Sequence, residues 1–137
     1  MKVNQEVTKR LPANNLLDFT AHRCSVIVTL RLFATKWKPC IICFLAVKPM
    51  RYNELWKSIP NISRKVLSQH LDELEMDGLI TRTEHDAKLQ RVEYQLSSKG
   101  ESLLSVIDCI QDWGLHHIEG VASIHEMIQA ASAGQRN

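Results

Sequence analysis

At 137 residues, the chain is long enough for one domain with its own hydrophobic core, and its 45% hydrophobic content is ordinary for a globular protein. No window approaches the roughly 20 apolar residues of a membrane-spanning helix, and the first residues lack the apolar core of a signal peptide. These features predict a cytoplasmic protein without a membrane partner, whose four cysteines are thiols rather than a disulfide framework.

Positive charge is concentrated in one part of the chain. The formal net charge is only +2, yet the segment from Arg31 to Lys65 holds eight basic residues and a single acid, Glu54. Such a local positive field suits the binding of nucleic-acid phosphates. A solvated basic surface without a function would give the same pattern.

The chain is expected to form three regions. Residues 1–15 are polar and predict an N-terminal arm, residues 16–128 form the domain, and residues 129–137 are a flexible C-terminal tail. No internal repeat or low-complexity linker interrupts the middle region, so we expect one domain per chain.

The first half of this domain is expected to be helical apart from one short strand. Apolar residues at helical spacing over 24–33 predict the first helix, and an almost wholly apolar run predicts a buried second helix over 35–47. Residues 49–52 are expected to be extended, with Asn53 as the N-cap of a short helix over 54–59.

A helix with two distinct faces is predicted to begin at Ser63, a good N-cap, and to end at Gly78, a usual C-terminal stop. Leucines at helical spacing would point into the core, whereas polar side chains occupy the opposite face. The leucines are Leu67, Leu71 and Leu74, and the polar residues are Lys65, Ser68, Gln69 and Asp72.

Two short alternating runs, 79–83 and 91–96, are joined by a charged turn and predict a hairpin directly after this helix. A helix that stops at a glycine and leads into a basic hairpin is typical of DNA-binding winged helices. The sequence therefore predicts a mainly α fold with a small β-wing (α+β). In this winged helix-turn-helix the helix enters the major groove and the wing lies over the neighbouring backbone.

Ten residues are candidates for contact with double-stranded DNA. Arginine and lysine can donate to guanine O6 and N7, glutamine can pair with adenine, and a helix N-terminus favours a phosphate. Because Glu84 and Asp86 would repel phosphate, Arg91 is the strongest candidate in the wing. The candidates are Arg51, Asn53, Ser63, Arg64, Lys65, Ser68, Gln69, Lys88, Gln90 and Arg91.

Two helices are expected after the hairpin, the first capped by Ser97 and separated from the second by a break at Gly114. Their apolar faces exceed what one small domain covers, and such surplus faces tend to be buried in a partner. We therefore predict a homodimer built from the flanking N- and C-terminal helices. Its interface would include Trp113, Ile118, Val121 and Ile128.

These residues resemble the HxlR-type branch of the MarR-like winged-helix regulators over about 24–114. The matching motifs are Cys24, Lys36-Trp37-Lys38, residues 51–55, 62–67, 71–80 and 92–97, Gly100 and Trp113-Gly114. The resemblance implies a homodimeric transcriptional regulator, a repressor rather than an activator, on a pseudo-palindromic operator. Several members of the family sense electrophiles or oxidants through the cysteine that matches Cys24.

The chain departs from the family pattern at four places. Ser25 stands where a proline usually follows the cysteine, and Ala34-Thr35 stands where a glycine-rich pair is common. Asp72 stands where a basic residue is common, so a phosphate contact is missing there or Asp72 faces solvent. The pair Cys40/Cys43 is not a hallmark of the family.

The cysteines allow two interpretations each. Cys24 follows His22 and Arg23 near a helix start, where positive charge and the helix dipole lower a thiol pKa and favour oxidation. Alternatively, it is a small apolar residue at a dimer interface. Cys40 and Cys43 form a Cys-x-x-Cys pair, but no βαβ unit or second Cys/His pair accompanies it, so we expect core residues rather than a redox or zinc site.

No Ser/His/Asp arrangement, phosphate-binding glycine loop or apolar carboxylate pair occurs in the sequence, so we predict no enzyme, cofactor or metal. Transcriptional regulation, with an oxidant or small-molecule effector as an option, is the main hypothesis. Two others stay open. One is a winged-helix interaction module that has lost DNA binding, and the other is a thiol-disulfide protein that uses the Cys-x-x-Cys pair.

Overall fold

The computed structural model describes residues 24–86, 88 and 91–134, and the predicted arm 1–15 therefore lies outside the described residues. The chain divides into two units, Met1–Ala34 and Thr35–Asn137. In the first unit, helix α2 (Ser25–Phe33) begins after Cys24, which is its N-cap residue. The first helix is thus confirmed over nearly its predicted length.

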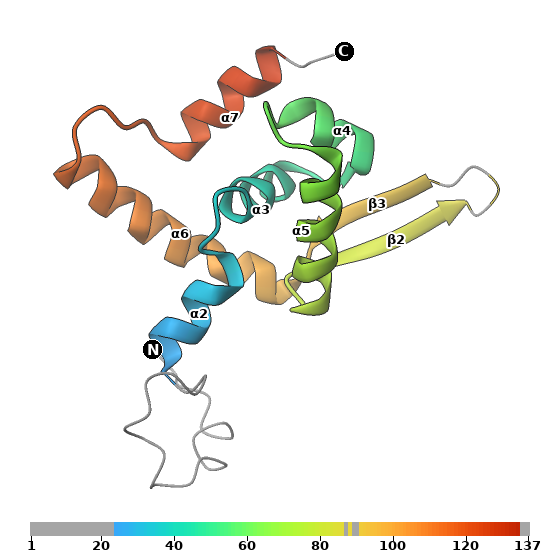
Figure 1. Cartoon of the computed structure of the whole chain (residues 1–137), viewed down its shortest axis with the longest axis horizontal. Helices are drawn as coiled ribbons and strands as arrows, with labels where there is room; N and C mark the ends of the chain where they lie inside the picture. Colours follow the sequence, from blue (N-terminus) through green and yellow to red (C-terminus); the bar gives the residue numbers. More distant parts are fainter. Residues whose placement is uncertain (1–23, 87, 89–90, 135–137) are drawn as a thin grey trace, which may run out of the picture. The chain divides into compact units, whose positions relative to one another are not determined.

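The second unit contains the remaining elements (Figure 1). In chain order they are α3 (Lys38–Val47), β1 (Met50–Arg51), α4 (Tyr52–Ser58), α5 (Arg64–Met76), β2 (Ile80–Asp86), β3 (Arg91–Leu96), α6 (Ser98–His117) and α7 (Ile124–Ala133). This order is the predicted one, and it gives a mostly helical unit with one small sheet.

Helix α3 forms the centre of this unit. Ile41, Ile42, Phe44 and Leu45 are almost completely buried, and the helix contacts α6, α7 and β3. Pro39 stands in its first turn, where a missing N–H costs nothing. An apolar helix surrounded by other elements is what the sequence predicted here.

The sheet has the order β1-β3-β2 and is antiparallel throughout. Its base is anchored in the core, because Met50 pairs with Tyr94 and Ile80 with Leu96, and Met50, Tyr94 and Ile80 are buried. Beyond Ile80, β2 is exposed along its whole length, and with β3 it extends away from the helices as the wing (Figure 1).

Helix α5 packs its predicted leucine face into the core, with Leu67, Leu71 and Leu74 at most 1% exposed. Ser63 caps it, since its Oγ accepts a hydrogen bond from the Val66 N–H at 3.1 Å. After the helix, Gly78 adopts a φ of +76°, a conformation that favours glycine. These three predictions are confirmed.

The short helix α4 begins earlier than predicted. Its N-cap is Arg51, whose backbone N–H donates to Glu54 Oε1 at 3.2 Å, and Asn53 lies inside the first turn. The prediction of Asn53 as N-cap was wrong. The error has a physical reason, because the carboxylate of Glu54 accepts from the Arg51 N–H and so favours a helix that begins after Arg51 rather than after Asn53.

The C-terminal helices also differ from the prediction. Helix α6 continues through Gly114 to His117, and the chain turns at Gly120, which has a φ of +77°. Helix α7 continues to Ala133, inside the segment 129–137 that we expected to be a flexible tail. No described helix is long and apolar enough to cross a membrane.

Ile128 is a correction to the predicted dimer interface. It is only 8% exposed, because α7 packs against α3 and carries this side chain into the core of its own unit. The apolar positions of α7 were counted as surplus surface, but the core of one chain covers this one.

Two glycines in α6, Gly100 and Gly114, allow a test of how closely this helix packs against the segment at Leu79. A methyl group on Gly100 would overlap the carbonyl oxygen of Leu79, whereas nothing described lies within 4 Å of one on Gly114. We expect Gly100→Ala to lower the free energy of unfolding by about 2 kcal/mol or more through overpacking. Gly114→Ala is expected to leave it unchanged or raise it by up to about 1 kcal/mol. Urea unfolding followed by circular dichroism measures both, and a Gly100→Ala variant as stable as the wild type would contradict this packing.

Candidate nucleic-acid interface

The polar face of α5 is exposed. Lys65, Ser68, Gln69 and Asp72 all lie at the surface, opposite the buried leucines. The predicted polar face is therefore confirmed as a surface, since an amphipathic helix that buries its leucines exposes the residues on its opposite side. Asp72, at the position where the family pattern has a basic residue, is exposed on the same face as Lys65 and Gln69.

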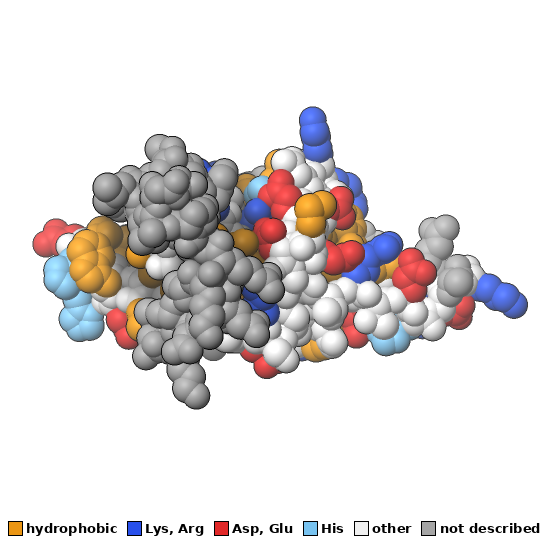
Figure 2. Space-filling view, turned by 90° about the horizontal axis from the view of Figure 1, so that it is seen from below, with side chains coloured by type: hydrophobic (Ala, Val, Ile, Leu, Met, Phe, Trp, Pro, Cys, Tyr) orange, Lys and Arg blue, Asp and Glu red, His pale blue; other side chains and the backbone are white. Residues whose placement is uncertain are grey.

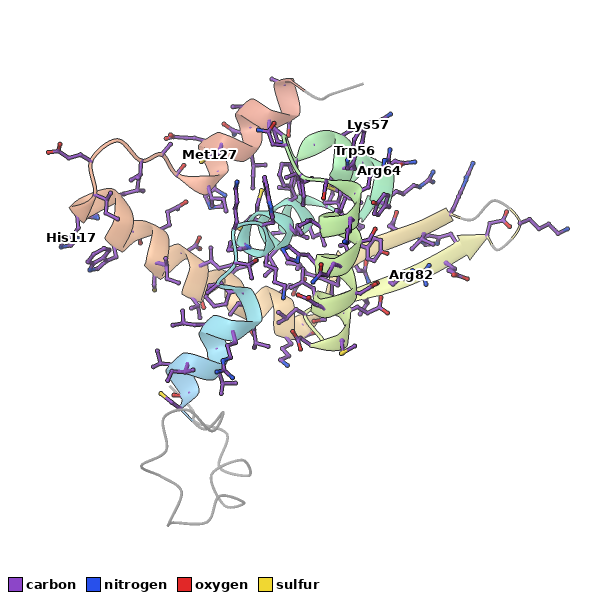
Figure 3. All side chains as sticks on the ribbon, viewed as in Figure 1. Trp56, Lys57, Arg64, Arg82, His117 and Met127 are labelled. Atoms are coloured by element: carbon purple, nitrogen blue, oxygen red, sulfur yellow. The ribbon has the colours of Figure 1, made fainter. Side chains whose placement is uncertain are left out.

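Contacts between five residues join the N-terminus of α5 to α4, and we call these residues the Arg64 cluster: Tyr52, Asn53, Trp56, Arg64 and Ser68. Figure 3 labels Trp56 and Arg64. The Tyr52 hydroxyl donates to the backbone carbonyl of Arg64 at 3.0 Å and accepts from Ser68 Oγ at 3.1 Å. Arg64 Nη1 donates to Asn53 Oδ1 at 3.2 Å. The Arg64 guanidinium lies over the Trp56 ring, with Cζ 4.1 Å from the ring centroid. Three predicted site residues, Asn53, Arg64 and Ser68, thus share one network.

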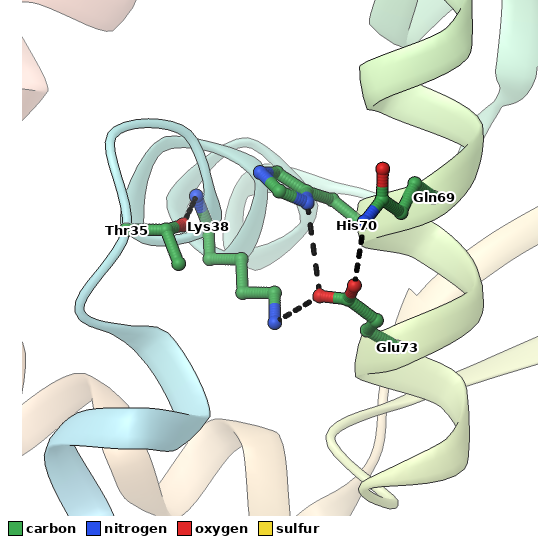
Figure 4. A network of polar contacts seen from close by, with 5 residues as sticks. All are labelled: Thr35, Lys38, Gln69, His70 and Glu73. Carbon is green, nitrogen blue, oxygen red and sulfur yellow. Dashed lines mark hydrogen bonds and ion pairs between the residues drawn. The ribbon is translucent and has the colours of Figure 1, made fainter.

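A second network holds the C-terminal half of α5 to α3 (Figure 4). Glu73 accepts from Gln69 Nε2 at 3.1 Å through Oε1, and its Oε2 lies 2.6 Å from Lys38 Nζ. The hydrogen bond from Lys38 lowers the pKa of the Glu73 carboxyl, and the one from Gln69 adds to the effect. Burial lowers the pKa of the neighbouring His70 imidazole, which keeps it neutral beside the Lys38 charge.

Lys38 changes the interpretation of the charge pattern. We counted it in the basic segment that would face phosphates, yet its side chain is only 6% exposed and is paired with Glu73. Lys48 Nζ also lies 3.5 Å from a carboxylate oxygen of Glu54. The positive field toward solvent is therefore weaker than the residue count suggested, because the count left out Glu73, the partner of Lys38 outside the segment.

A groove of about 740 Å³ lies between the start of α4 and the wing. Arg51, Arg82 and Arg91 line it, together with Tyr52, Asn53, Glu54, Val92 and Tyr94. Arg51, Asn53 and Arg91 are among the predicted site residues, whereas Arg82, which pairs across the hairpin with Tyr94, is not. The antiparallel register could have revealed it, since residues opposite one another on two strands share a face.

The wing carries acids as well as bases, and Figure 2 shows red and blue side chains side by side at the right, where the wing extends. Arg82 Nη2 lies 3.6 Å from Glu84 Oε1, and both side chains are largely exposed. Lys88 is exposed, and its backbone N–H donates to Asp86 Oδ1 at 2.9 Å. Gln90, the remaining predicted wing residue, lies outside the described residues.

The cysteines have different surroundings. Burial raises the pKa of the Cys40 and Cys43 thiols to about 11, so both are protonated and unreactive at neutral pH. The described residues contain no cluster of His, Cys, Asp and Glu that could hold a metal ion. Cys24 is half-buried, and Cys109 on α6 is exposed. Cys109 lies in no sequence motif and was therefore not predicted as a site residue.

The remaining predicted interface residues are exposed. Trp113, Ile118 and Val121 have exposed fractions of 60%, 51% and 48%, which is high for apolar side chains. The Trp113 ring stacks on His117 with ring centroids 4.7 Å apart. Figure 2 shows hydrophobic and histidine side chains together at this end of α6.

A three-stranded sheet with a wing, and a helix whose polar face lies beside it, define a winged helix-turn-helix protein. Residues 32–121 match the family of HxlR-like helix-turn-helix proteins. The chain belongs to this family and is a transcriptional regulator of the helix-turn-helix type.

Its relatives are regulators as well. The uncharacterized HTH-type transcriptional regulator YtcD of Bacillus subtilis (strain 168) is 41% identical over 100 residues, which cover 73% of this chain and 79% of YtcD. The crystal structure of a putative HTH-type regulator ytcD superimposes with a TM-score of 0.66 at 40% identity, covering 70% of this chain and 98% of that one.

Two further solved structures are described by their redox state. The reduced transcriptional regulator YodB of B. subtilis has a TM-score of 0.66 at 29% identity, over 73% of this chain and 98% of YodB, and diamide-treated and quinone-bound forms are also solved. The reduced redox regulator HypR has a TM-score of 0.64 at 29% identity, over 69% of this chain and 93% of HypR.

The two partners in the Lys38–Glu73 pair are expected to respond unequally to substitution. Glu73→Gln leaves a 6%-exposed ammonium without its carboxylate, and we expect it to lower the free energy of unfolding by about 2–3 kcal/mol. Lys38→Met removes the buried charge and leaves a carboxylate that is 40% exposed, so the loss should stay below about 1 kcal/mol. Urea unfolding compares the two, and equal losses would contradict the unequal burial.

Proposed function

We propose that this regulator binds double-stranded DNA as a homodimer, with α5 in the major groove and the wing over the backbone. The observation that carries the proposal is the exposed polar face of α5 beside a groove lined by Arg51, Arg82 and Arg91. A base-reading helix next to fixed positive charge is the arrangement that winged helices use.

The individual residues fall into two groups by their chemistry. Lys65, Ser68 and Gln69 are the base-reading candidates, and Gln69 keeps a free amide oxygen and one N–H for adenine while its other N–H bonds Glu73. Arginines of the groove would bind phosphates, as would the N-terminus of α5 at Ser63 and the wing residue Lys88.

The proposed homodimer follows from the exposed apolar residues of the C-terminal region. Trp113, Ile118 and Val121 would be buried against a second copy, which matches the tendency of large exposed apolar patches to be interfaces. A two-fold dimer presents two recognition helices about 34 Å apart, one turn of DNA, to a pseudo-palindromic operator.

We propose that the protein acts in the cytoplasm and that binding represses transcription because the bound protein occludes the promoter. We also propose an oxidant as the signal, received by Cys24 at the N-cap of α2. The support is the similarity to HypR, described as a redox regulator, and to YodB, solved in reduced and diamide-treated forms. A small-molecule effector is the second class of signal that the proposal allows.

Direct binding tests the recognition face. We expect the protein to bind the promoter beside its own gene, and Gln69→Ala or Lys65→Ala to weaken that binding by about 1–3 kcal/mol per protomer. Fluorescence anisotropy with a labelled duplex measures the affinity, while circular dichroism and light scattering show that fold and assembly are unchanged. If neither substitution changes the affinity, α5 does not read the operator through this face.

Arg82→Ala is the matched control for phosphate contact. It should reduce the slope of log affinity against log salt by about 0.9 per phosphate contact without changing the preference between operator variants. Glu84→Gln, which removes an acid beside Arg82, should raise the affinity.

No binding at low salt, either to this promoter or to genomic fragments, would favour the interaction module without DNA binding.

Oxidation tests the proposed signal. Diamide is expected to release the protein from its operator, dithiothreitol to restore binding, and Cys24→Ser to abolish the response. Cys109→Ser tells whether the exposed thiol on α6 takes part, and Cys40→Ala is the control, since the Cys40 pKa of about 11 keeps this thiol protonated. Binding that is indifferent to diamide would show that the signal lies elsewhere.

A further inference from the structure

We propose that Trp56 is a positioning residue for DNA binding, and that it acts by holding the Arg64 guanidinium ready for a pair of acceptors on DNA. This inference rests on the proposed function. The acceptors are guanine O6 and N7 or two phosphate oxygens, which present the same chemistry to a guanidinium.

The geometry of the Arg64 cluster carries the inference. Arg64 is the first residue of α5, and its guanidinium lies over two aromatic rings of α4, with Cζ 4.1 Å from the Trp56 centroid and 5.8 Å from that of Tyr52. Tyr52 and Trp56 are four residues apart and therefore share one side of α4. Asn53 fixes the edge of the guanidinium by accepting from Nη1 at 3.2 Å. One face and one edge of the Arg64 group are thus held before any ligand arrives.

This arrangement leaves donors for a ligand. Stacking uses the face of a guanidinium, whereas its several N–H groups lie in the plane. Among the described contacts, one of these groups donates to Asn53, so the others stay available along the outer edge. Because a free arginine must lose rotamer freedom when it binds, a guanidinium that is already stacked binds with a smaller entropic loss.

The residues of α4 that are anchored in the core are neighbours of Trp56 and not Trp56 itself. Leu55 and Ile59 are fully buried and Ser58 is buried with them, whereas Trp56 is only half-buried. A substitution at Trp56 should therefore change the Arg64 side chain more than it changes the position of α4. Lys57, the exposed neighbour of Trp56, is the matched control.

A double-mutant cycle on operator affinity tests the inference, with Trp56→Leu, Arg64→Ala and the double variant. We expect Trp56→Leu alone to weaken binding by about two- to fivefold per protomer, the size of an exposed cation–π contact. In the Arg64→Ala background it should have no further effect, and Trp56→Phe should restore most of the affinity. Lys57→Ala should combine additively with Arg64→Ala.

The outcomes separate this inference from the proposed function. If the wild-type protein shows no selective binding, the proposed function fails and the positioning role fails with it. If binding is selective but Trp56→Leu has no effect, or the same effect with and without Arg64, only the positioning role is overturned. A second measurement needs no DNA: the Arg64 side-chain NMR signals should show a ring-current shift that Trp56→Leu removes, and unshifted signals would overturn the stack itself.

The same variants identify the acceptors. A smaller salt slope for Arg64→Ala, with unchanged base preference, assigns phosphate oxygens. An unchanged slope with a relaxed preference at one base pair assigns guanine. Either result supports the positioning role, provided that the coupling between Trp56 and Arg64 is measured.

Discussion

Burial of the leucine face of α5 is the constraint on which the rest of the interface depends. A helix can be rotated about its axis in many ways, but Leu67, Leu71 and Leu74 fit the core in only one of them. Each fully buried leucine contributes roughly 1.5–3 kcal/mol, so turning the helix would lose several kcal/mol. Gln69 and Lys65 are therefore directed outward by residues that never touch a ligand.

Two polar networks refine what the leucines fix. Near its start α5 is joined to α4 through Tyr52 and Arg64, and in its last turn Glu73 joins it to the buried Lys38. Apolar packing fixes the rotation of a helix about its axis but allows small shifts of the helix along that axis. Polar contacts at both ends of α5 restrict such shifts. The polar face of α5 is consequently held both in rotation about the helix axis and in position along it.

Local sequence patterns predicted the elements better than the contacts between them. The apolar α3, the capped α5 and the wing were all evident, because each depends on residues near one another in the chain. Gly114 does not interrupt α6, since glycine in an exposed helix costs only about 1 kcal/mol. The Lys38–Glu73 pair and the burial of Ile128 could not be predicted, because each depends on partners far away in sequence. Arg82 was missed for a different reason, since its place in the groove follows from the pairing of the two strands of the hairpin and not from a motif.

The mixture of charges on the wing has a consequence for how such a regulator would search a chromosome. Arg82 and Arg91 lie in a groove, and the acids Glu84 and Asp86 stand on the same hairpin. In the proposed binding mode, those acids would repel DNA phosphates and weaken binding that no base contact reinforces, which would speed dissociation from wrong sequences. Discrimination would then arise partly from brief encounters at unrelated sites, and not only from a long residence at the operator.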